Sequence, residues 1–539
     1  MKFIKRFILT FNITLMLIFF CACSSQTTQI DNETIVNGSL GPQEELENNS
    51  NSSSVLNVGI LKNTGPLHPL YVANEQTQDI LSLIFEPAIK LNSIDTPSAS
   101  VIESWDVSED GLNYTFHVRQ NVYFHGNEST VSANDIISAL KTIMNADASV
   151  CKYSRYKGCV SSYSASDDYT INVTLNSPSR DIFYLMSFPV YPASVYSGLT
   201  ENTYKTPVGT GGYRVASYDQ ETGFVLEKND KWWRVAGNIS SVNVKFYKDN
   251  AEIISAYRNG EINCVINTDF SSAVYTSSTN STVYYTTTQY YDALVPNCRK
   301  YPLNSAEMRK GLSLALQRAD IIKQALQGEG VSTMTPLRTD KWYLNEVDRA
   351  SDSDKTAALE AFSKAGYSLD SNGILNSGGI ALSLNIVYCD NSDTGYKANV
   401  AQIIKSQLET VGITVNLTKL SNENMTAVLA NGNYDLALCS FYSGANDDVS
   451  MFFGTDSSLN YGGYYGESLQ SLNNAAKNAV GDGAVKTGYS ALYDYLFENS
   501  PHIGLYFRTH SFVLPSGLPN VGLIRTGQVF NDINTWKNS

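Results

Sequence analysis

The sequence is poor in the residues from which metal and catalytic sites are usually built. It contains five histidines and eight cysteines among 539 residues, and no CxxC pair. It also lacks the GxSxG, HExxH and GxxxxGK[ST] patterns of serine hydrolases, zinc proteases and phosphate loops. The adjacent acidic pairs Glu109-Asp110 and Asp447-Asp448 are best interpreted as solvated loop charges, so neither catalysis nor metal binding is indicated.

Positive charge is scarce as well. Lys and Arg number 38 against 52 Asp and Glu, which gives a formal net charge of −14. This balance argues against nucleic acid or an anionic membrane surface as a partner. The hydrophobic content of 42% and charged content of 17% are those of a globular protein. A chain of this length is too long for one core, so we expect two or three domains.

The amino terminus has the pattern of a secretion signal. Lys2, Lys5 and Arg6 precede an apolar run from Phe7 to Phe20, which is too short to span a bilayer comfortably. The run ends in Phe20-Cys21-Ala22-Cys23, and a small residue before a cysteine resembles a bacterial lipoprotein processing site. We predict that residues 1–22 are removed and that Cys23 carries a lipid. The alternative is an ordinary cleaved signal peptide without lipid.

Residues 24–54 are mostly Ser, Thr, Asn, Gln, Glu and Gly, with too few apolar residues to build a core. Together with Cys23 they predict a flexible tether over 23–54, which would hold a globular body outside the cell and near the membrane.

Six cysteines remain after the leader: Cys151, Cys159, Cys264, Cys298, Cys389 and Cys439. Outside the cell some of them could pair, and Cys151 with Cys159 is close enough in sequence to close a small loop. The sequence leaves this disulfide open.

The body reads as an α/β protein. After the turn Asp110-Gly111, apolar and polar residues alternate from Leu112 to Arg119, which predicts a half-buried strand. Ser132 with Asp135 predicts the start of an amphipathic helix that continues to Met144. Farther along, the alternation over 382–388, the helical stripe over 400–411 and the alternation over 413–417 predict a right-handed βαβ unit.

Four segments resemble a known family. Residues 103–140 read ESWDVSEDGLNYTFHVRQNVYFHGNESTVSANDIISAL, and Thr206–Tyr213, Asn229–Trp233 and the GEINCVI of 260–266 follow in order. They resemble the family 5 extracellular solute-binding proteins, the peptide-binding components of ABC importers. The resemblance implies the type II, large-cluster periplasmic-binding-protein-like fold. It has two α/β lobes joined by crossing strands, an extra small α/β domain and hinge closure over the ligand.

The resemblance also predicts the domain boundaries. Lobe I is expected at 55–95, 200–285 and 505–539, the extra domain at 96–199, and lobe II at 286–504. The run Gly209-Thr210-Gly211-Gly212 is interpreted as a tight backbone crossing and not as a phosphate loop, because no helix begins after it.

Candidate ligand-binding residues come from three loops. The loop after the first strand, which lines the cleft in the family, contributes Thr64, Gly65 and Leu67. An aromatic pair near the expected entry to lobe II contributes Tyr290 and Tyr291. The carboxyl end of the strand over 434–441 is where open α/β sheets bind ligands, and it contributes Phe441, Tyr442, Ser443, Gly444, Asn446 and Asp447.

One departure from the family concerns the substrate. In peptide-binding relatives the loop after that strand supplies an Asp that pairs with the α-amino group of the ligand. A gapless alignment places Gly444 there, with Asn446 and Asp447 two and three residues later. Either the charge has moved, or the ligand lacks a free amino terminus.

The resemblance implies an extracytoplasmic lipoprotein, anchored to the cell membrane, that binds a peptide as an added strand and passes it to a permease driven by an ATPase. We expect a monomer with no cofactor, no metal and no nucleic-acid partner. Alternatives on the same fold are an oligosaccharide, a nickel complex or a signalling peptide as ligand. A secreted hydrolase and a purely structural surface lipoprotein are alternatives of other classes.

Overall fold

The computed structural model describes residues 54–539, except 63–64, 66, 73, 127–128, 197, 199–205, 236, 277–279, 345–352, 391–394, 519–520, 522–523 and 537–539. The expected leader, the lipidation site Cys23 and nearly all of the expected tether lie outside the described residues, and so does Thr64. Within the described part of the chain, no helix combines the length and apolar character that crossing a membrane requires.

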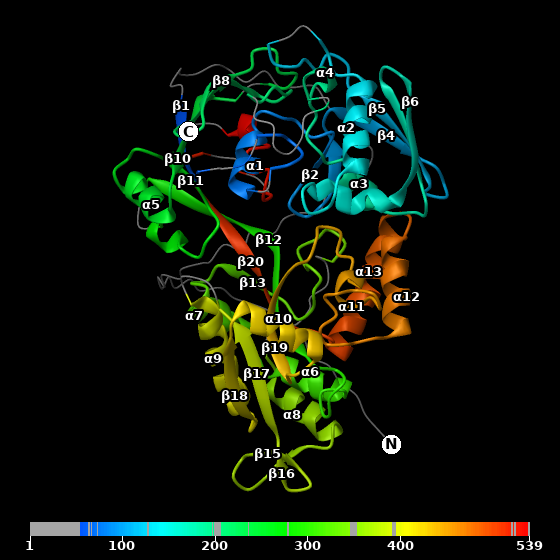
Figure 1. Ribbon diagram of the computed structural model, residues 1–539, viewed down its shortest axis with the longest axis vertical. Coiled ribbons are helices and arrows are strands. Elements are labelled where there is room, and N and C mark those ends of the chain that lie inside the picture. The colour runs from blue at the N-terminus through cyan, green and yellow to red at the C-terminus, as the bar shows by residue number, and fades with distance from the viewer. Residues whose placement is uncertain are drawn as a thin grey trace, which may run out of the picture. The chain divides into compact units, whose positions relative to one another are not determined.

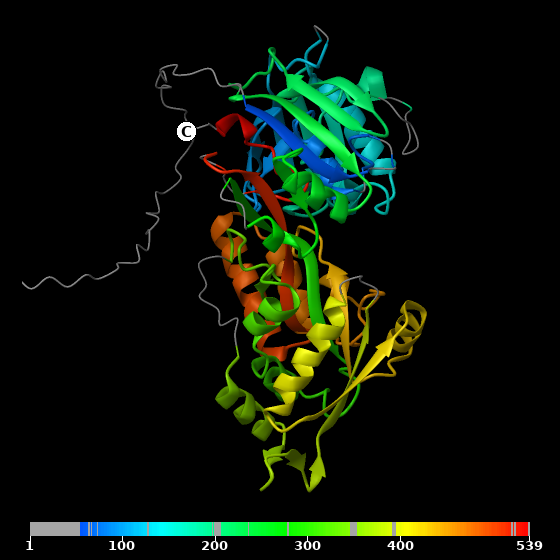
Figure 2. The same cartoon turned by 90° about the vertical axis from the view of Figure 1, so that its left-hand side faces the viewer.

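Two long antiparallel strands connect the two lobes. β12 spans Ser281–Pro296, β20 spans Ile503–Pro515, and they pair along most of their length. Both views show them side by side (Figure 1, Figure 2). They occupy the middle of a sheet in the order β18-β17-β19-β12-β20-β11-β1-β10-β9-β8, with β13 also on β20. These are the crossing strands that the family resemblance predicts.

Lobe I consists of the elements that pack around a large core containing Val58, Phe116 and Trp536 and around a smaller core containing Ile253 and Ile262. Its part of the main sheet lies beyond β20, where β1 runs parallel to both β10 and β11. Its strands and helices there are β1 (Ser54–Leu61), α1 (Glu75–Leu81), β2 (Ile89–Leu91), β3 (Pro97–Ala99), β8 (Tyr213–Asp219), β9 (Gly223–Lys228), β10 (Ile239–Tyr247), α5 (Asn250–Arg258) and β11 (Cys264–Asn267). The chain end returns to this core, where Phe530 and Trp536 pack on Phe512 of β20.

The expected extra domain has its own antiparallel sheet in the order β4-β5-β7-β6. The predicted strand over 112–118 is β5, and the predicted helix is α2, which starts with the Ser132–Asp135 capping box. This segment shares its core with the rest of lobe I. Its elements are β4 (Ile102–Val107), β5 (Asn113–Val118), α2 (Ala133–Asn145), η1 (Lys152–Cys159), β6 (Val160–Asp167), β7 (Thr170–Leu175), α3 (Asp181–Leu185) and α4 (Ala193–Tyr196).

The predicted glycine crossing is present. The amide of Gly211 donates to the Ile84 carbonyl at 2.8 Å, and a Cβ at Gly209 would lie 2.2 Å from that same oxygen, so only glycine fits. α1 ends at Leu81, and the carbonyls of Leu83 and Ile84 beyond it accept hydrogen bonds from the amides of the crossing segment.

Lobe II consists of the elements that pack around two further cores, one containing Ile386 and Leu438 and one containing Tyr291 and Phe452. The predicted βαβ unit is present, with β17 parallel to β18 and α9 between them. The main strands and helices of lobe II are β13 (Gly330–Ser332), α6 (Ala306–Leu314), α7 (Arg318–Ala325), α8 (Lys355–Lys364), β17 (Ser383–Cys389), α9 (Tyr396–Glu409), β18 (Thr414–Leu420), α10 (Asn422–Asn431), β19 (Leu436–Tyr442), α11 (Ser450–Phe453), α12 (Glu467–Lys477) and α13 (Asp482–Asn499). The fold is therefore the predicted two-lobed α/β fold, whereas the residue-level domain boundaries stay predictions.

Candidate functional site

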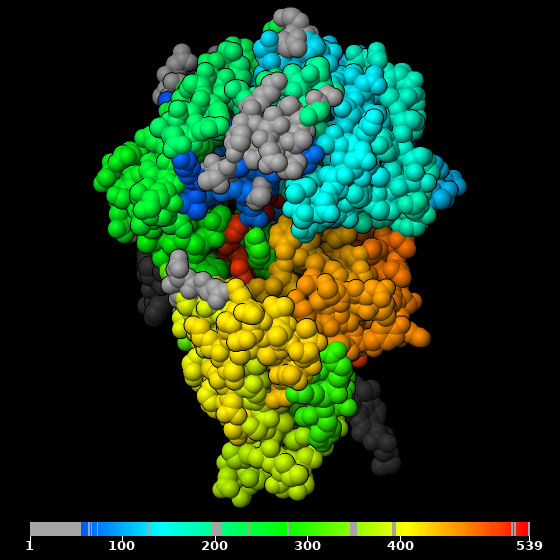
Figure 3. Space-filling model, in the orientation of Figure 1, coloured from blue at the N-terminus to red at the C-terminus, as the bar shows by residue number. Residues whose placement is uncertain are grey.

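A cavity of about 400 Å³ lies beside the two crossing strands, and its walls come from both lobes. In the space-filling view the surface is hollowed at this place, with green and red atoms of the crossing strands deep in the hollow (Figure 3). Lobe I contributes residues of α1, η1 and the segment near the chain end, and lobe II contributes β19 and the loops beside it. The residues that line the cavity include Glu75, Gln78, Lys152, Tyr153, Arg155, Tyr156, Thr286, Thr287, Gln289, Tyr290, Arg338, Tyr442, Ala445 and Arg525.

A pair of tyrosines separates this cavity from a second one. Tyr290 of β12 and Tyr442 of β19 are register partners, and their rings meet edge to face with centroids 5.4 Å apart. Both residues also line a second cavity of about 410 Å³, whose wall includes Asp390, Lys397 and Arg508. The two predicted tyrosines Tyr290 and Tyr442 are therefore at the site, and they divide it.

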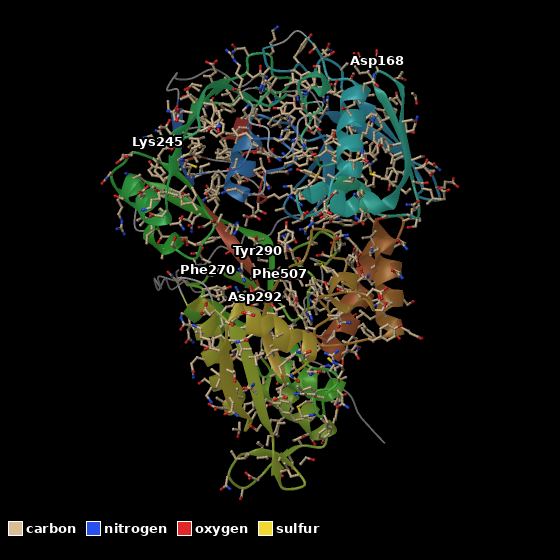
Figure 4. The ribbon with its side chains drawn as sticks, viewed as in Figure 1. Asp168, Lys245, Phe270, Tyr290, Asp292 and Phe507 are labelled. Atoms are coloured by element: carbon tan, nitrogen blue, oxygen red, sulfur yellow. The ribbon has the colours of Figure 1, made fainter. Side chains whose placement is uncertain are left out.

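Tyr291 lies on the other face of β12, because successive side chains of a strand point to opposite faces. It is fully buried and packs on Phe441, Phe452 and Phe507. Figure 4 shows Tyr290, Asp292 and Phe507 close together on the crossing strands. The predicted ligand role of Tyr291 does not fit this placement, because its side chain belongs to the core of lobe II and lines neither cavity.

Glu75 is the single acidic residue among those that line the first cavity. Its Oε2 lies 3.1 Å from Nδ1 of His510, and Lys152 is close enough to interact with it electrostatically. Burial raises the pKa of Glu75, but the contacts with His510 and Lys152 outweigh burial and lower it overall. Glu75 is therefore ionised at neutral pH and already compensated by its neighbours.

Two of the four cations in the cavity wall are also paired within the protein. Arg338 donates to both carboxylate oxygens of Asp340, at 2.9 and 2.6 Å. Arg525 donates to Asp95 and to the Asn92 carbonyl, and burial lowers its pKa to about 10. These pairs hold the wall together and leave little charge for a ligand.

The remaining two cations are on η1. Nζ of Lys152 donates to the Gln78 side chain at 2.6 Å. The guanidinium of Arg155 lies over the ring of Tyr442, 5.0 Å from its centroid, and it has no ion pair or hydrogen bond with any described residue. Arg155 is exposed and lines the cavity, so its positive charge is available to pair with a ligand.

A buried charge network joins the lobes next to the cavity. Asp95 accepts hydrogen bonds from Lys341, Arg525 and Tyr184, and Lys341 is fully buried. Nζ of Lys341 also donates to the Ala445 carbonyl at 2.7 Å. The network therefore ties the β2–β3 turn of lobe I to two loops of lobe II.

Asp447 belongs to the same network and not to the cavity wall. Its Oδ2 accepts a 2.5 Å hydrogen bond from Tyr343, and it lies 3.8 Å from Nζ of Lys341. Burial raises the pKa of Asp447 to about 7, although Tyr343 and Arg338 partly oppose this. The charge of Lys341 is neutralised mainly by Asp95, so burial dominates at Asp447.

The other polar residues that we predicted in this loop also form hydrogen bonds within the protein. Ser443 donates to the Gln289 carbonyl at 3.2 Å, and Asn446 donates to Asp181 at 2.8 Å. Gly444 has a φ of +72°, the left-handed region that favours glycine. Ala445, which we did not predict, lines the cavity, while Phe441 lines the second cavity. The loop is therefore beside the site, but its polar side chains face the protein.

The loop after β1 reaches the cavity through Val72, but not through the residues that we predicted. Leu67 is buried in the core of lobe I, and Gly65 lines neither cavity, while Thr64 is outside the described residues. This expectation of a ligand-contacting loop is not met for the two residues that the structure describes.

The possible disulfide is absent, because Cys151 and Cys159 are both free thiols. The eight residues of η1 follow Cys151 and end at Cys159. A 3₁₀-helix rises about 2 Å per residue, so it spans roughly 16 Å, whereas a disulfide needs Cα atoms within about 7 Å. The helix that carries Arg155 therefore keeps the two cysteines apart.

Sequence reasoning missed Glu75, Lys152, Arg155 and Arg525. The segment Lys152-Tyr153-Ser154-Arg155-Tyr156 interleaves basic and aromatic residues, which suits a binding surface. That signal was available, but only the fold brings η1 next to β12 and β19.

Comparison with known proteins gives a consistent result. The family of bacterial extracellular solute-binding proteins, family 5 Middle, matches residues 96–463. The oligopeptide-binding protein AppA of Bacillus subtilis (strain 168) is 22% identical over 480 residues, which is 86% of this chain and 87% of that protein.

Solved structures share the fold at low sequence identity. The oligopeptide-binding protein AppA of Bacillus subtilis in complex with a nonapeptide has a TM-score of 0.62 and 19% identity, covering 90% of this chain and 99% of that one. A nickel ABC transporter structure from Bacillus halodurans has a TM-score of 0.74 and 18% identity, covering 88% of this chain and 98% of that one. Proteins named for different ligands thus have this fold.

Proposed function

The chain belongs to the family 5 bacterial extracellular solute-binding proteins, and from this premise we propose that it captures short peptides in the cavity between its lobes. As a member of this family it is an extracytoplasmic solute-binding protein of an ABC importer, and the family consists of transport proteins rather than enzymes. The peptide ligand and its handover to a permease and ATPase are our proposal.

The single observation that carries the peptide ligand is an unpaired strand edge at the cavity. β19 pairs with β12 only from Tyr290 to Pro296, whereas β20 pairs with the other edge of β12 from Ser281 onward. Among the described residues, no strand covers the first edge between Ser281 and Thr288, and Thr286 and Thr287 line the cavity there. Backbone N–H and C=O groups on such an edge require partners.

An extended peptide supplies those partners. Added beside β12, its main chain would form ladder hydrogen bonds that do not depend on its side chains. The tyrosines Tyr290, Tyr442 and Tyr153 would then contact the peptide side chains through amphipathic rings. This arrangement predicts binding of peptides of varied sequence.

Native mass spectrometry of the gently purified protein tests the proposal. We expect an added mass that is lost on denaturation and that fragments as a mixture of short peptides. A ligand at about 100 times its dissociation constant should also stabilise the protein by roughly 2.7 kcal/mol. A uniform non-peptide or metal-complex mass would contradict the peptide proposal, and turnover of the bound peptide would favour a hydrolase.

We also propose that the chain is a lipoprotein. Residues 1–22 would be removed and Cys23 would carry the lipid, so that residues 23–54 tether a monomeric body to the membrane. The variant Cys23→Ala tests this: it should move the protein from the membrane fraction to the soluble fraction. Cys21→Ala is the matched control, and it should leave the distribution unchanged.

A further inference from the structure

The charges that line the first cavity are mostly positive. They comprise Lys152, Arg155, Arg338 and Arg525 against the one carboxylate of Glu75. This is opposite in sign to the whole chain, whose net charge is −14. A cavity with this lining attracts anionic groups and disfavours cationic ones.

Of these four cations, one has no carboxylate partner within the described part of the protein. Arg338 is paired with Asp340, and Arg525 is paired with Asp95, which it shares with Lys341. Lys152 and Glu75 lie close enough to compensate one another. Arg155 lies over the face of Tyr442 and has no ion pair or hydrogen bond with any described residue. A guanidinium that is already paired gains little from a ligand, whereas an unpaired one can form a new charge-assisted, bidentate hydrogen bond to a carboxylate.

The structure offers little for a free amino group. Gly444, which the alignment places where relatives have an Asp, has no side chain, and Asp447 is held by Tyr343 and buried. Glu75 remains, but His510 and Lys152 already surround its carboxylate. An ammonium group would have to displace or compete with these neighbours.

We propose that Arg155 binds a carboxylate of the ligand, so that the protein selects its peptides by a free carboxylate and not by a free amino terminus. This inference rests on the proposed function and names the substrate class for the same cavity. Tyr442, under the guanidinium, and Tyr290 beside it would orient Arg155 along the free edge of β12. The carboxylate would be the carboxyl terminus of a peptide that lies on this edge.

Four libraries of random tri- to pentapeptides test the proposal directly. One library has both ends free, one is acetylated at the amino terminus, one is amidated at the carboxyl terminus, and one is blocked at both ends. The full-length protein, freed of copurified ligand by washing in denaturant and refolding, is offered each library, and the bound fraction is measured by native mass spectrometry. We expect the acetylated library to bind as well as the free one, and the amidated library to bind about 10- to 100-fold more weakly.

Three variants assign the effect to Arg155. Arg155→Gln should weaken binding of free-carboxyl peptides about 10- to 100-fold and leave the amidated peptides unchanged, while Arg155→Lys should restore part of the loss. Arg258→Gln is the matched control, because Arg258 on α5 is also exposed, has no ion pair among the described residues and lines neither cavity. Its affinity should equal that of the wild type.

The outcomes separate this inference from the function on which it rests. Equal binding of free and amidated peptides, or an unchanged affinity of Arg155→Gln, would refute the role of Arg155 and leave peptide binding standing. Binding that is lost on acetylation alone would show that the amino terminus is recognised, and Glu75 would then be the residue to vary. If none of the four libraries binds to protein that has regained its thermal unfolding transition, both proposals are wrong.

Discussion

The loop from Ser443 to Asp448 and the helix η1 reach the same cavity from opposite lobes, and they use their polar residues differently. In the loop, the polar residues Asn446, Asp447 and Asp448 each have a partner inside the protein: Asp181, Tyr343 and Lys477 respectively. On η1, the guanidinium of Arg155 lies over the ring of Tyr442 and forms no ion pair or hydrogen bond with a described residue. A polar residue at the end of a buried strand is therefore available to a ligand only if its side chain is not already paired within the protein.

The difference follows from how much water each segment excludes. Asp447 and Lys341 are buried between the lobes, where an unpaired charge is costly, so pairing within the protein is required. Arg155 is exposed to the cavity, where water hydrates it until a ligand arrives. The loop thus stabilises the contact between the lobes, while η1 is free to recognise a ligand.

The largest effect should come from breaking the buried network. Asp95→Ala would leave the buried Lys341 and the half-buried Arg525 without this carboxylate, and we expect the free energy of unfolding to fall by about 3–5 kcal/mol. Chemical denaturation measures this, and Asp456→Ala, at an exposed position, is the control. If the lobes instead separate, water can hydrate the two cations. The free energy of unfolding would then stay near that of the wild type, and small-angle scattering would show a larger radius of gyration. That result would contradict a structural role of the network in folding.

A pH series sharpens the comparison at Asp447. Its pKa is raised from 3.8 to about 7, so between these values the folded state holds a proton that the unfolded state has lost. The contribution of Asp447 to stability therefore falls as pH rises from about 4 to 7. Asp447→Asn cannot titrate, so the stability of the wild type relative to this variant should decrease over that interval by up to about 4 kcal/mol. Denaturation curves at pH 4 and pH 8 measure the change, and an equal difference at both pH values would refute it.

A smaller effect is expected where the loop holds helix α3. Asn446→Ala removes the hydrogen bond to Asp181, whose pKa burial raises and Asn446 partly lowers. We expect a loss of about 1–2 kcal/mol in stability and no change in the preference for free-carboxyl peptides. Asn474→Ala, on the exposed face of α12, is the control. A changed end-group preference in Asn446→Ala would place the loop, and not η1, in ligand recognition.

The smallest effect should follow reduction of the protein. A native disulfide contributes about 2–4 kcal/mol, but Cys151 and Cys159 are free thiols at the two ends of η1. A reducing agent should therefore leave the unfolding transition in place. Alkylation without prior reduction, followed by peptide mapping, should modify both cysteines once the protein is unfolded. An unmodified pair would show that the helix η1 is closed by a disulfide after all.

The sequence by itself determined the local elements and the family. Alternation of apolar residues placed β5, β17 and β18, the Ser132–Asp135 pair placed the start of α2, and the glycines at 209–212 predicted the backbone crossing. These features depend on periodicity, capping and backbone sterics, all of which act within a few residues. They are therefore readable without knowledge of distant partners.

Only the tertiary structure decided which side chains meet at the cavity. It placed Tyr290 at the site and Tyr291 in the core, buried Leu67, gave Asp447 a partner 104 residues away and brought Arg155 against Tyr442. Each outcome depends on strand register and on pairing of charges between segments far apart in the chain. Those distant contacts decide whether a charged side chain is paired within the protein or can pair with a ligand. The sequence pattern of one segment therefore does not predict it.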